Sequence, residues 1–150
     1  MNPMIYPLTI YYDASCPLCN AEMNNLMLRN HAQQLQFVDA SAAGFASPLP
    51  GIAQADLMNL IHARRADGNV VKGVEVFRLA YGAVGLGWVT APTAWPLLKQ
   101  LADHAYPWVV RHRYRFPRWL VHALFEGPTR RAAERAAQRA RCNGNQCHLR

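Results

Sequence analysis

Residues 11–20 read Tyr11-Tyr12-Asp13-Ala14-Ser15-Cys16-Pro17-Leu18-Cys19-Asn20, which places two cysteines three positions apart. A nearly unbroken apolar run at residues 5–12, of the kind that favours a buried strand, comes before them. The residues after them have the apolar spacing of a helix. The stretch therefore predicts a strand, a tight turn, a Cys-x-x-Cys pair and a helix, in that order.

The chemistry of thiols explains this order. A helix N-terminus carries unpaired N–H groups and about half a positive charge, which favour a thiolate at that position. Pro17 falls near the first helical position, where its missing N–H costs little and supports the helix start. Cys19 lies one turn further on the same side, within reach of Cys16 for a disulfide. We therefore expect a thioredoxin-like redox site in which Cys16 attacks a disulfide and Cys19 resolves the mixed disulfide.

Asp13 stands three residues before Cys16. An ionised carboxylate there would raise the pKa of Cys16, or could carry a proton for Cys19 when the mixed disulfide is released. A structural role is compatible with this, in which Asp13 turns the chain by accepting the backbone N–H groups of residues 15 and 16. Because Pro17-Leu18 includes no cationic side chain, we expect nothing charged within the motif to lower the pKa of Cys16 beyond the effect of the helix end. This favours an intermediate or reducing site over a strongly oxidising one.

The motif at residues 12–20, Tyr12-Asp13-x-x-Cys16-Pro17-x-Cys19-Asn20, resembles the signature of the DCC family (DUF393) of thiol-disulfide oxidoreductases. The resemblance continues at Phe37-Val38-Asp39, Ile61-His62-x-x-x-x-Asp67-Gly68, Gly73-Val74-Glu75-Val76-Phe77, Tyr106 and Arg113-Tyr114. It implies a thioredoxin-like fold, with Asp13, Cys16 and Cys19 as the functional residues. The substrate would then be a protein or a small molecule that contains a disulfide or a thiol.

The order of patterns along the chain predicts an α/β fold, with a βαβ unit and a β-hairpin forming a mixed four-stranded sheet on which helices pack. Asp67-Gly68 is the turn signal of the hairpin. The expected strands are residues 5–12 and 35–39 and the two hairpin arms within 57–65 and 69–72. The expected helices are residues 16–29, a short one around 53–58, one from residue 74, and those at 93–103 and 130–141; residues 41–51 are expected to be a loop.

The composition fits a globular protein, with 150 residues of which 51% are hydrophobic and 17% are charged. We expect a thioredoxin-like domain at residues 1–115 and a basic helical extension with a cysteine-containing tail at residues 116–150. No secretory signal is visible at the N-terminus, and no apolar run reaches 18 residues. The four cysteines form two close pairs, which is unlike the disulfide framework of a secreted protein, so we expect a cytoplasmic protein.

Charge is unevenly distributed along the chain. Residues 1–110 contain six Lys or Arg and seven Asp or Glu, whereas residues 111–150 contain ten Arg and two Glu. Residues 104–125 interleave aromatic residues with Arg and His, which is compatible with aromatics that complete the core under Arg side chains. The alternative is a helix that docks to an anionic membrane surface or a partner protein. Nucleic acid is disfavoured, because no nucleic-acid motif accompanies the charge.

The second cysteine pair, Cys142 and Cys147, has three open interpretations. It can be an internal relay that exchanges with the Cys16–Cys19 disulfide, part of a metal site with the first pair and His148, or an inert tail. No phosphate loop or dinucleotide fingerprint is present, so we expect no cofactor beyond the thiols, and no metal. The competing hypothesis is a non-catalytic module that binds metal through the four cysteines, or docks through the Arg-rich C-terminus.

Overall fold

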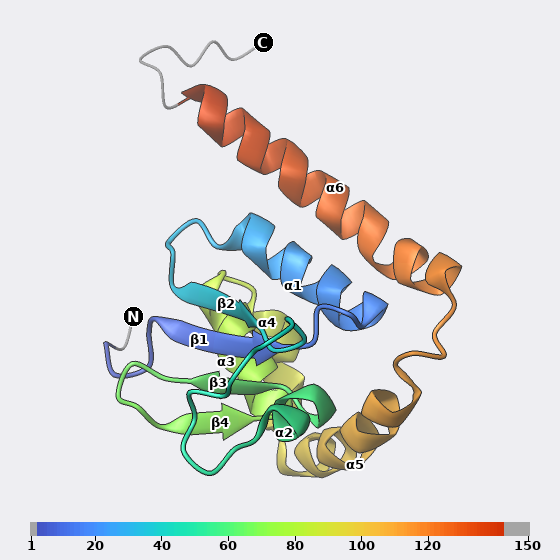
Figure 1. Cartoon of the computed structure of the whole chain (residues 1–150). Helices are drawn as coiled ribbons and strands as arrows, with labels where there is room; N and C mark the ends of the chain where they lie inside the picture. Colours follow the sequence, from blue (N-terminus) through green and yellow to red (C-terminus); the bar gives the residue numbers. More distant parts are fainter. Residues whose placement is uncertain (1–2, 143–150) are drawn as a thin grey trace.

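The computed structural model describes residues 3–142 and consists of a four-stranded mixed sheet with helices around it (Figure 1). The strand order is β2-β1-β3-β4. β1 pairs with β2 in parallel and with β3 antiparallel, and β3 pairs with β4 antiparallel. The strands are β1 (Leu8–Tyr12), β2 (Leu35–Asp39), β3 (His62–Arg64) and β4 (Val70–Lys72). The predicted fold class, a βαβ unit followed by a hairpin, is confirmed.

The helices follow the strands as the sequence patterns indicate, with some changes of bounds described below. The helices are α1 (Pro17–Arg29), α2 (Gln54–Asn59), α3 (Val74–Ala83), α4 (Gly87–Thr90), the 3-10 helix η1 (Ala91–Ala94), α5 (Pro96–His112) and α6 (Arg118–Cys142). Within residues 3–142 no helix is long and apolar enough to cross a membrane.

The central strand β1 is buried on both faces of the sheet, as its apolar run predicts. Leu8, Ile10 and Tyr12 pack with residues of α1 and α3 in one core cluster. Tyr11 points to the opposite face, where it packs with Leu57 of α2 and with residues of the loop after β2. This alternation fixes β1 between two apolar layers and holds its carboxyl end, where Asp13 and Cys16 follow, in one place.

Two expected strands are shorter in the structure. β1 begins at Leu8 and not at residue 5. The first hairpin arm begins at His62, because residues 57–59 belong to α2. In α2 the Asp56 carboxylate accepts the backbone N–H of Ala53 at 2.9 Å, and Leu57 is buried in the core. The N-terminal cap and this packing extend the helix over residues that β propensity assigned to the strand.

The helix expected at 93–103 begins later and ends later, because α5 runs from Pro96 to His112 with Pro107 inside it. A proline in a helix interior costs about 3 kcal/mol, so tertiary contacts must hold this helix together. Tyr106 packs edge-on against Phe77 of α3 with ring centroids 6.1 Å apart, and Arg113 after the helix is anchored in the interior. These contacts lie on both sides of Pro107.

The helix expected at 130–141 is the C-terminal part of a longer one, since α6 already begins at Arg118. α6 runs alongside α1 (Figure 1), and Val121 near its start is buried. The contact with α1 explains why the helix continues through Gly127-Pro128, where the local signals predict a break. The domain boundary after residue 115 stays a prediction.

Candidate active site

Cys16 is the N-cap residue of α1, and Pro17 is the first residue of that helix. The Sγ of Cys16 accepts a hydrogen bond from the backbone N–H of Cys19 at 3.3 Å. The cap therefore places one sulfur against the unpaired N–H groups of the first turn, as the motif predicts. Both thiols are free in the structure.

The two thiols of the pair have opposite pKa shifts. The hydrogen bond from the Cys19 side chain is the largest cause that lowers the pKa of Cys16, to about 7, and the backbone N–H of Cys19 and the charge of Arg113 act in the same direction. Burial and the charge of Asp13 oppose this shift. The hydrogen bond with Cys16, together with burial, raises the pKa of Cys19. The directions of the two shifts favour the thiolate on Cys16 and the proton on Cys19.

Asp13 is buried, with 2% of its surface exposed, and it organises the turn before α1. Its Oδ1 accepts the backbone N–H of Ser15 at 3.0 Å and the Ser15 hydroxyl at 2.5 Å. The turn-forming role is confirmed for residue 15. It is wrong for residue 16, because the N–H of Cys16 donates to the backbone carbonyl of Asp13 at 3.3 Å and not to the carboxylate.

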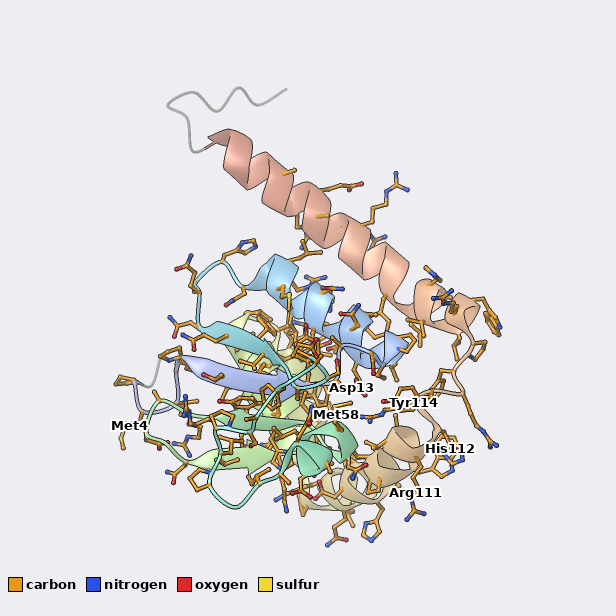
Figure 2. The ribbon with its side chains drawn as sticks, viewed as in Figure 1. Met4, Asp13, Met58, Arg111, His112 and Tyr114 are labelled. Carbon is orange, nitrogen blue, oxygen red and sulfur yellow. The ribbon has the colours of Figure 1, made fainter. Side chains whose placement is uncertain are left out.

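The other carboxylate oxygen of Asp13 is held by two residues that follow α5. The Nη2 of Arg113 lies 3.3 Å from Asp13 Oδ2, and the Tyr114 hydroxyl donates a hydrogen bond to the same oxygen. Arg113 Nη2 also donates to the backbone carbonyl of Met58, near the end of α2. Figure 2 shows Asp13, Met58 and Tyr114 gathered where α5 ends. A buried carboxylate is thus neutralised and hydrogen-bonded.

The charge of Arg113, from outside the motif, adds to the causes that lower the pKa of Cys16. The motif at residues 12–20 contains no cation, and the sequence alone does not show which distant side chain reaches it. The available signal was the match of Arg113-Tyr114 to the DCC pattern, which assigned both residues to the domain but not to the site. The fold brings them to Asp13 from the other end of the domain.

An apolar cavity of about 360 Å³ lies beside the dithiol and was not predicted. Cys19 forms part of its wall, whereas Cys16 has no exposed surface. Glu22, one turn after Cys19 on α1, also lines the cavity, and the Tyr81 hydroxyl donates to its Oε1 at 2.6 Å. Burial raises the pKa of Glu22 above its ordinary value.

The second cysteine pair falls at the end of α6 and beyond the described residues. Cys142 is the last residue of α6, and Cys147 lies outside the described residues, as does His148. Among residues 3–142 no group of three or more His, Cys, Asp or Glu side chains is placed to hold a metal ion. The relay through Cys142 and Cys147 stays a prediction.

Comparison with known proteins identifies a family and a relative. The model of a family described as DCC1-like thiol-disulfide oxidoreductase matches residues 10–119. An uncharacterized chloroplastic protein of Arabidopsis thaliana is 36% identical over 144 residues, which cover 94% of this chain and 67% of the plant protein. No solved structure matches the chain. The matched range contains the dithiol, Asp13 and both residues that hold its carboxylate.

Proposed function

The chain belongs to the DCC1-like thiol-disulfide oxidoreductase family, and from this premise we propose that it catalyses thiol-disulfide exchange with Cys16 as the attacking thiol and Cys19 as the resolving thiol. Family membership supports a redox role on substrates that contain thiols. The finer assignment rests on one observation, the hydrogen bond that the Cys16 sulfur accepts from the N–H of Cys19 at the start of α1. That contact favours a thiolate on Cys16 and leaves the proton on its neighbour.

The exchange takes place in two steps. The Cys16 thiolate attacks one sulfur of a substrate disulfide, forming a mixed disulfide and releasing the other substrate sulfur as a thiolate. Cys19 then loses its proton and attacks the sulfur of Cys16, which releases the second substrate thiolate and closes the Cys16–Cys19 disulfide. Two electrons pass from the protein to the substrate. We assign the acceptance of the Cys19 proton to Asp13, whose charge also acts on this thiol.

Access to Cys16 requires a local opening of the site. No surface of Cys16 is exposed, and the hydroxyl of Tyr114 holds Asp13, only three residues away. Opening by local unfolding needs far less free energy than global unfolding and is common at active sites. The substrate disulfide would approach Cys16 once the residues around the start of α1 move apart.

A redox titration in glutathione buffers tests this function directly, with free thiols counted at each potential in metal-analysed protein. In the wild type we expect two thiols to titrate together with one midpoint, and in Cys16→Ser this transition disappears. Thiols that stay masked until a chelator removes a stoichiometric metal would overturn the proposal in favour of a metal-binding module. A Cys142→Ser/Cys147→Ser variant belongs in the same series, since cycling as fast as the wild type contradicts the relay.

A second proposal is that the C-terminal helices dock the protein to an anionic membrane surface. Trp108 of α5 and Trp119 of α6 are 59% and 69% exposed, and exposed Arg111, Arg115 and Arg118 lie close to them in the chain. Aromatic residues beside arginines suit the interface between lipid tails and headgroups. We expect sedimentation with anionic vesicles at low salt and release at high salt. Absence of binding at low salt rejects a membrane and leaves a partner protein.

The cytoplasmic location also stays a proposal. It rests on the two close cysteine pairs, which are unlike the disulfide framework of a secreted protein. The plant relative is described as chloroplastic, and that description concerns the plant protein.

A further inference from the structure

The cavity beside the dithiol has the size and the chemistry of a small-molecule site. Its volume of about 360 Å³ is in the range of ligand pockets, which are typically apolar with a few polar groups. Its polar and charged lining residues include Asp13, Cys19, Glu22 and Arg113. Most of its wall is apolar, and the residues that form it include Leu18, Met23, Leu57, Ile61, Phe77 and Val109.

The cavity reaches only one of the two sulfur-bearing residues. Cys19 lines it and is partly exposed, whereas Cys16 is fully buried at the helix cap. A molecule that enters the cavity therefore meets Cys19 first. The cavity gives access to Cys19 without a movement of the site. The attack of Cys16 on a substrate, in contrast, requires the residues around the start of α1 to open.

We propose that the cavity binds a small apolar thiol, which is the electron donor of the cycle and reduces the Cys16–Cys19 disulfide by attacking Cys19. The inference rests on the proposed function, because it needs the oxidised pair that this function produces. It adds the class of reductant, the place where the reductant binds and the sulfur with which it reacts.

The electrons and atoms balance in two exchanges. The donor thiolate forms a bond to the Sγ of Cys19 and breaks the bond between the two cysteines, so that Cys16 leaves as a thiolate. A second molecule of the donor, or a second thiol of the same molecule, attacks the donor sulfur of the mixed disulfide and releases Cys19. The donor leaves as its disulfide, and the protein regains both thiols. Two electrons pass from donor to protein.

The hydrogen bonds at the helix cap favour Cys16 as the leaving group. A thiol with a lower pKa leaves faster in disulfide exchange, and the pKa of Cys16 is lowered to about 7 while that of Cys19 is raised. The backbone N–H of Cys19, at 3.3 Å from the sulfur, is already in place to receive the released thiolate. Attack on Cys19 thus breaks the disulfide in the favoured direction.

Glu22 is placed to take the proton of the incoming thiol. It lines the same cavity one turn after Cys19, and the hydroxyl of Tyr81 holds its Oε1 at 2.6 Å. A half-buried carboxylate whose pKa is raised is a stronger base than an ordinary one. The reductant can therefore enter as a neutral thiol, the form that an apolar cavity admits, and become a thiolate beside Cys19.

The test compares two thiols as reductants of the oxidised Cys142→Ser/Cys147→Ser protein, namely apolar benzyl mercaptan and polar 2-mercaptoethanol. We expect benzyl mercaptan to react at least about tenfold faster at equal concentration and to saturate, because it binds before it reacts. Acid quenching followed by alkylation and tandem mass spectrometry then locates the adduct. A benzylthio group on Cys19 and an alkyl group on Cys16 support the proposal, and the reverse pattern overturns it.

Two cavity variants and one control complete the test. Val89 lines the cavity and is 45% exposed, so Val89→Trp adds volume at the cavity with little risk to the core. In this variant and in Val109→Phe we expect the ratio of the two rates to fall to about one. The control Val70→Phe enlarges an exposed residue of β4 and should keep the ratio of the parent protein. Equal rates for both thiols in the parent protein overturn the proposal that the cavity binds the reductant. They leave the proposed function intact. Failure to form any Cys16–Cys19 disulfide overturns the proposed function itself.

Discussion

Replacing Arg113 by methionine is expected to lower the free energy of unfolding by about 3–5 kcal/mol, because it leaves a buried carboxylate without its cation. Asp13 and Arg113 are 2% and 8% exposed, and Nη2 lies 3.3 Å from Oδ2. The substitution also removes a positive charge that lowers the pKa of Cys16, so this pKa should rise. Urea denaturation measures the first effect, and thiolate absorbance against pH, with Cys16→Ser as the blank, measures the second.

The control for this prediction is Arg78→Met, which breaks a surface pair. Arg78 Nη1 lies 2.7 Å from Glu75 Oε2, and both side chains are substantially exposed, so we expect a loss of about 0–1 kcal/mol. Asp13→Asn combined with Arg113→Met should recover part of the stability, since it removes the unpaired charge. Equal losses in Arg113→Met and Arg78→Met would show that the Asp13–Arg113 pair contributes no more than a surface contact.

Replacing Cys19 by alanine is expected to leave the substrate covalently attached to Cys16, because no second thiol resolves the mixed disulfide. The same change removes the side-chain hydrogen bond that is the largest cause of the low pKa of Cys16. The pKa should then rise from about 7 toward the ordinary value of 9.0. At pH 7 the thiolate fraction would fall from about a half toward the order of 1%. Mass spectrometry of the trapped adduct and thiolate absorbance measure the two effects.

The matched control is Asn20→Ala, the next residue of α1, which should neither trap substrate nor move the pKa of Cys16. The Cys142→Ser/Cys147→Ser background excludes resolution by the second pair. Rapid release of substrate from Cys19→Ala in that background would contradict the resolving role. An unchanged pKa would mean that the side-chain hydrogen bond from Cys19 does not stabilise the thiolate.

Local sequence patterns were sufficient to predict the strand and the helix that carry the dithiol. The apolar run before Asp13, the proline after Cys16 and the Asp67-Gly68 turn each act within a few residues, so they predict β1, the start of α1 and the hairpin. The strand β2 matches its predicted bounds, and its first residues, Leu35-Gln36-Phe37, alternate between apolar and polar. Here the local preference and the tertiary packing agree.

The parts of the site that the sequence did not predict depend on contacts between residues far apart in the chain. Nothing near Arg113 shows that its side chain meets Asp13, and nothing near Glu22 shows that the Tyr81 hydroxyl reaches it. The cavity forms between α1 and helices that come much later in the chain, so no single stretch encodes it. The continuation of α5 past Pro107 was not predicted for the same reason, since tertiary contacts outweigh the local cost of a proline inside a helix.

Because Arg113 comes late in the chain, its contacts with Asp13 and Met58 form late during synthesis on the ribosome. Both cysteines and Asp13 are made early, but the cation that joins Asp13 to the carbonyl of Met58 is added only after the whole of α5. A nascent chain that ends at residue 112 thus carries the dithiol without the charge that helps to hold Cys16 as a thiolate. The contribution of Arg113 to the low pKa of Cys16 is thus added only after residue 113 has been synthesised and has folded back, whereas the contribution of Cys19 needs no residue beyond the start of α1.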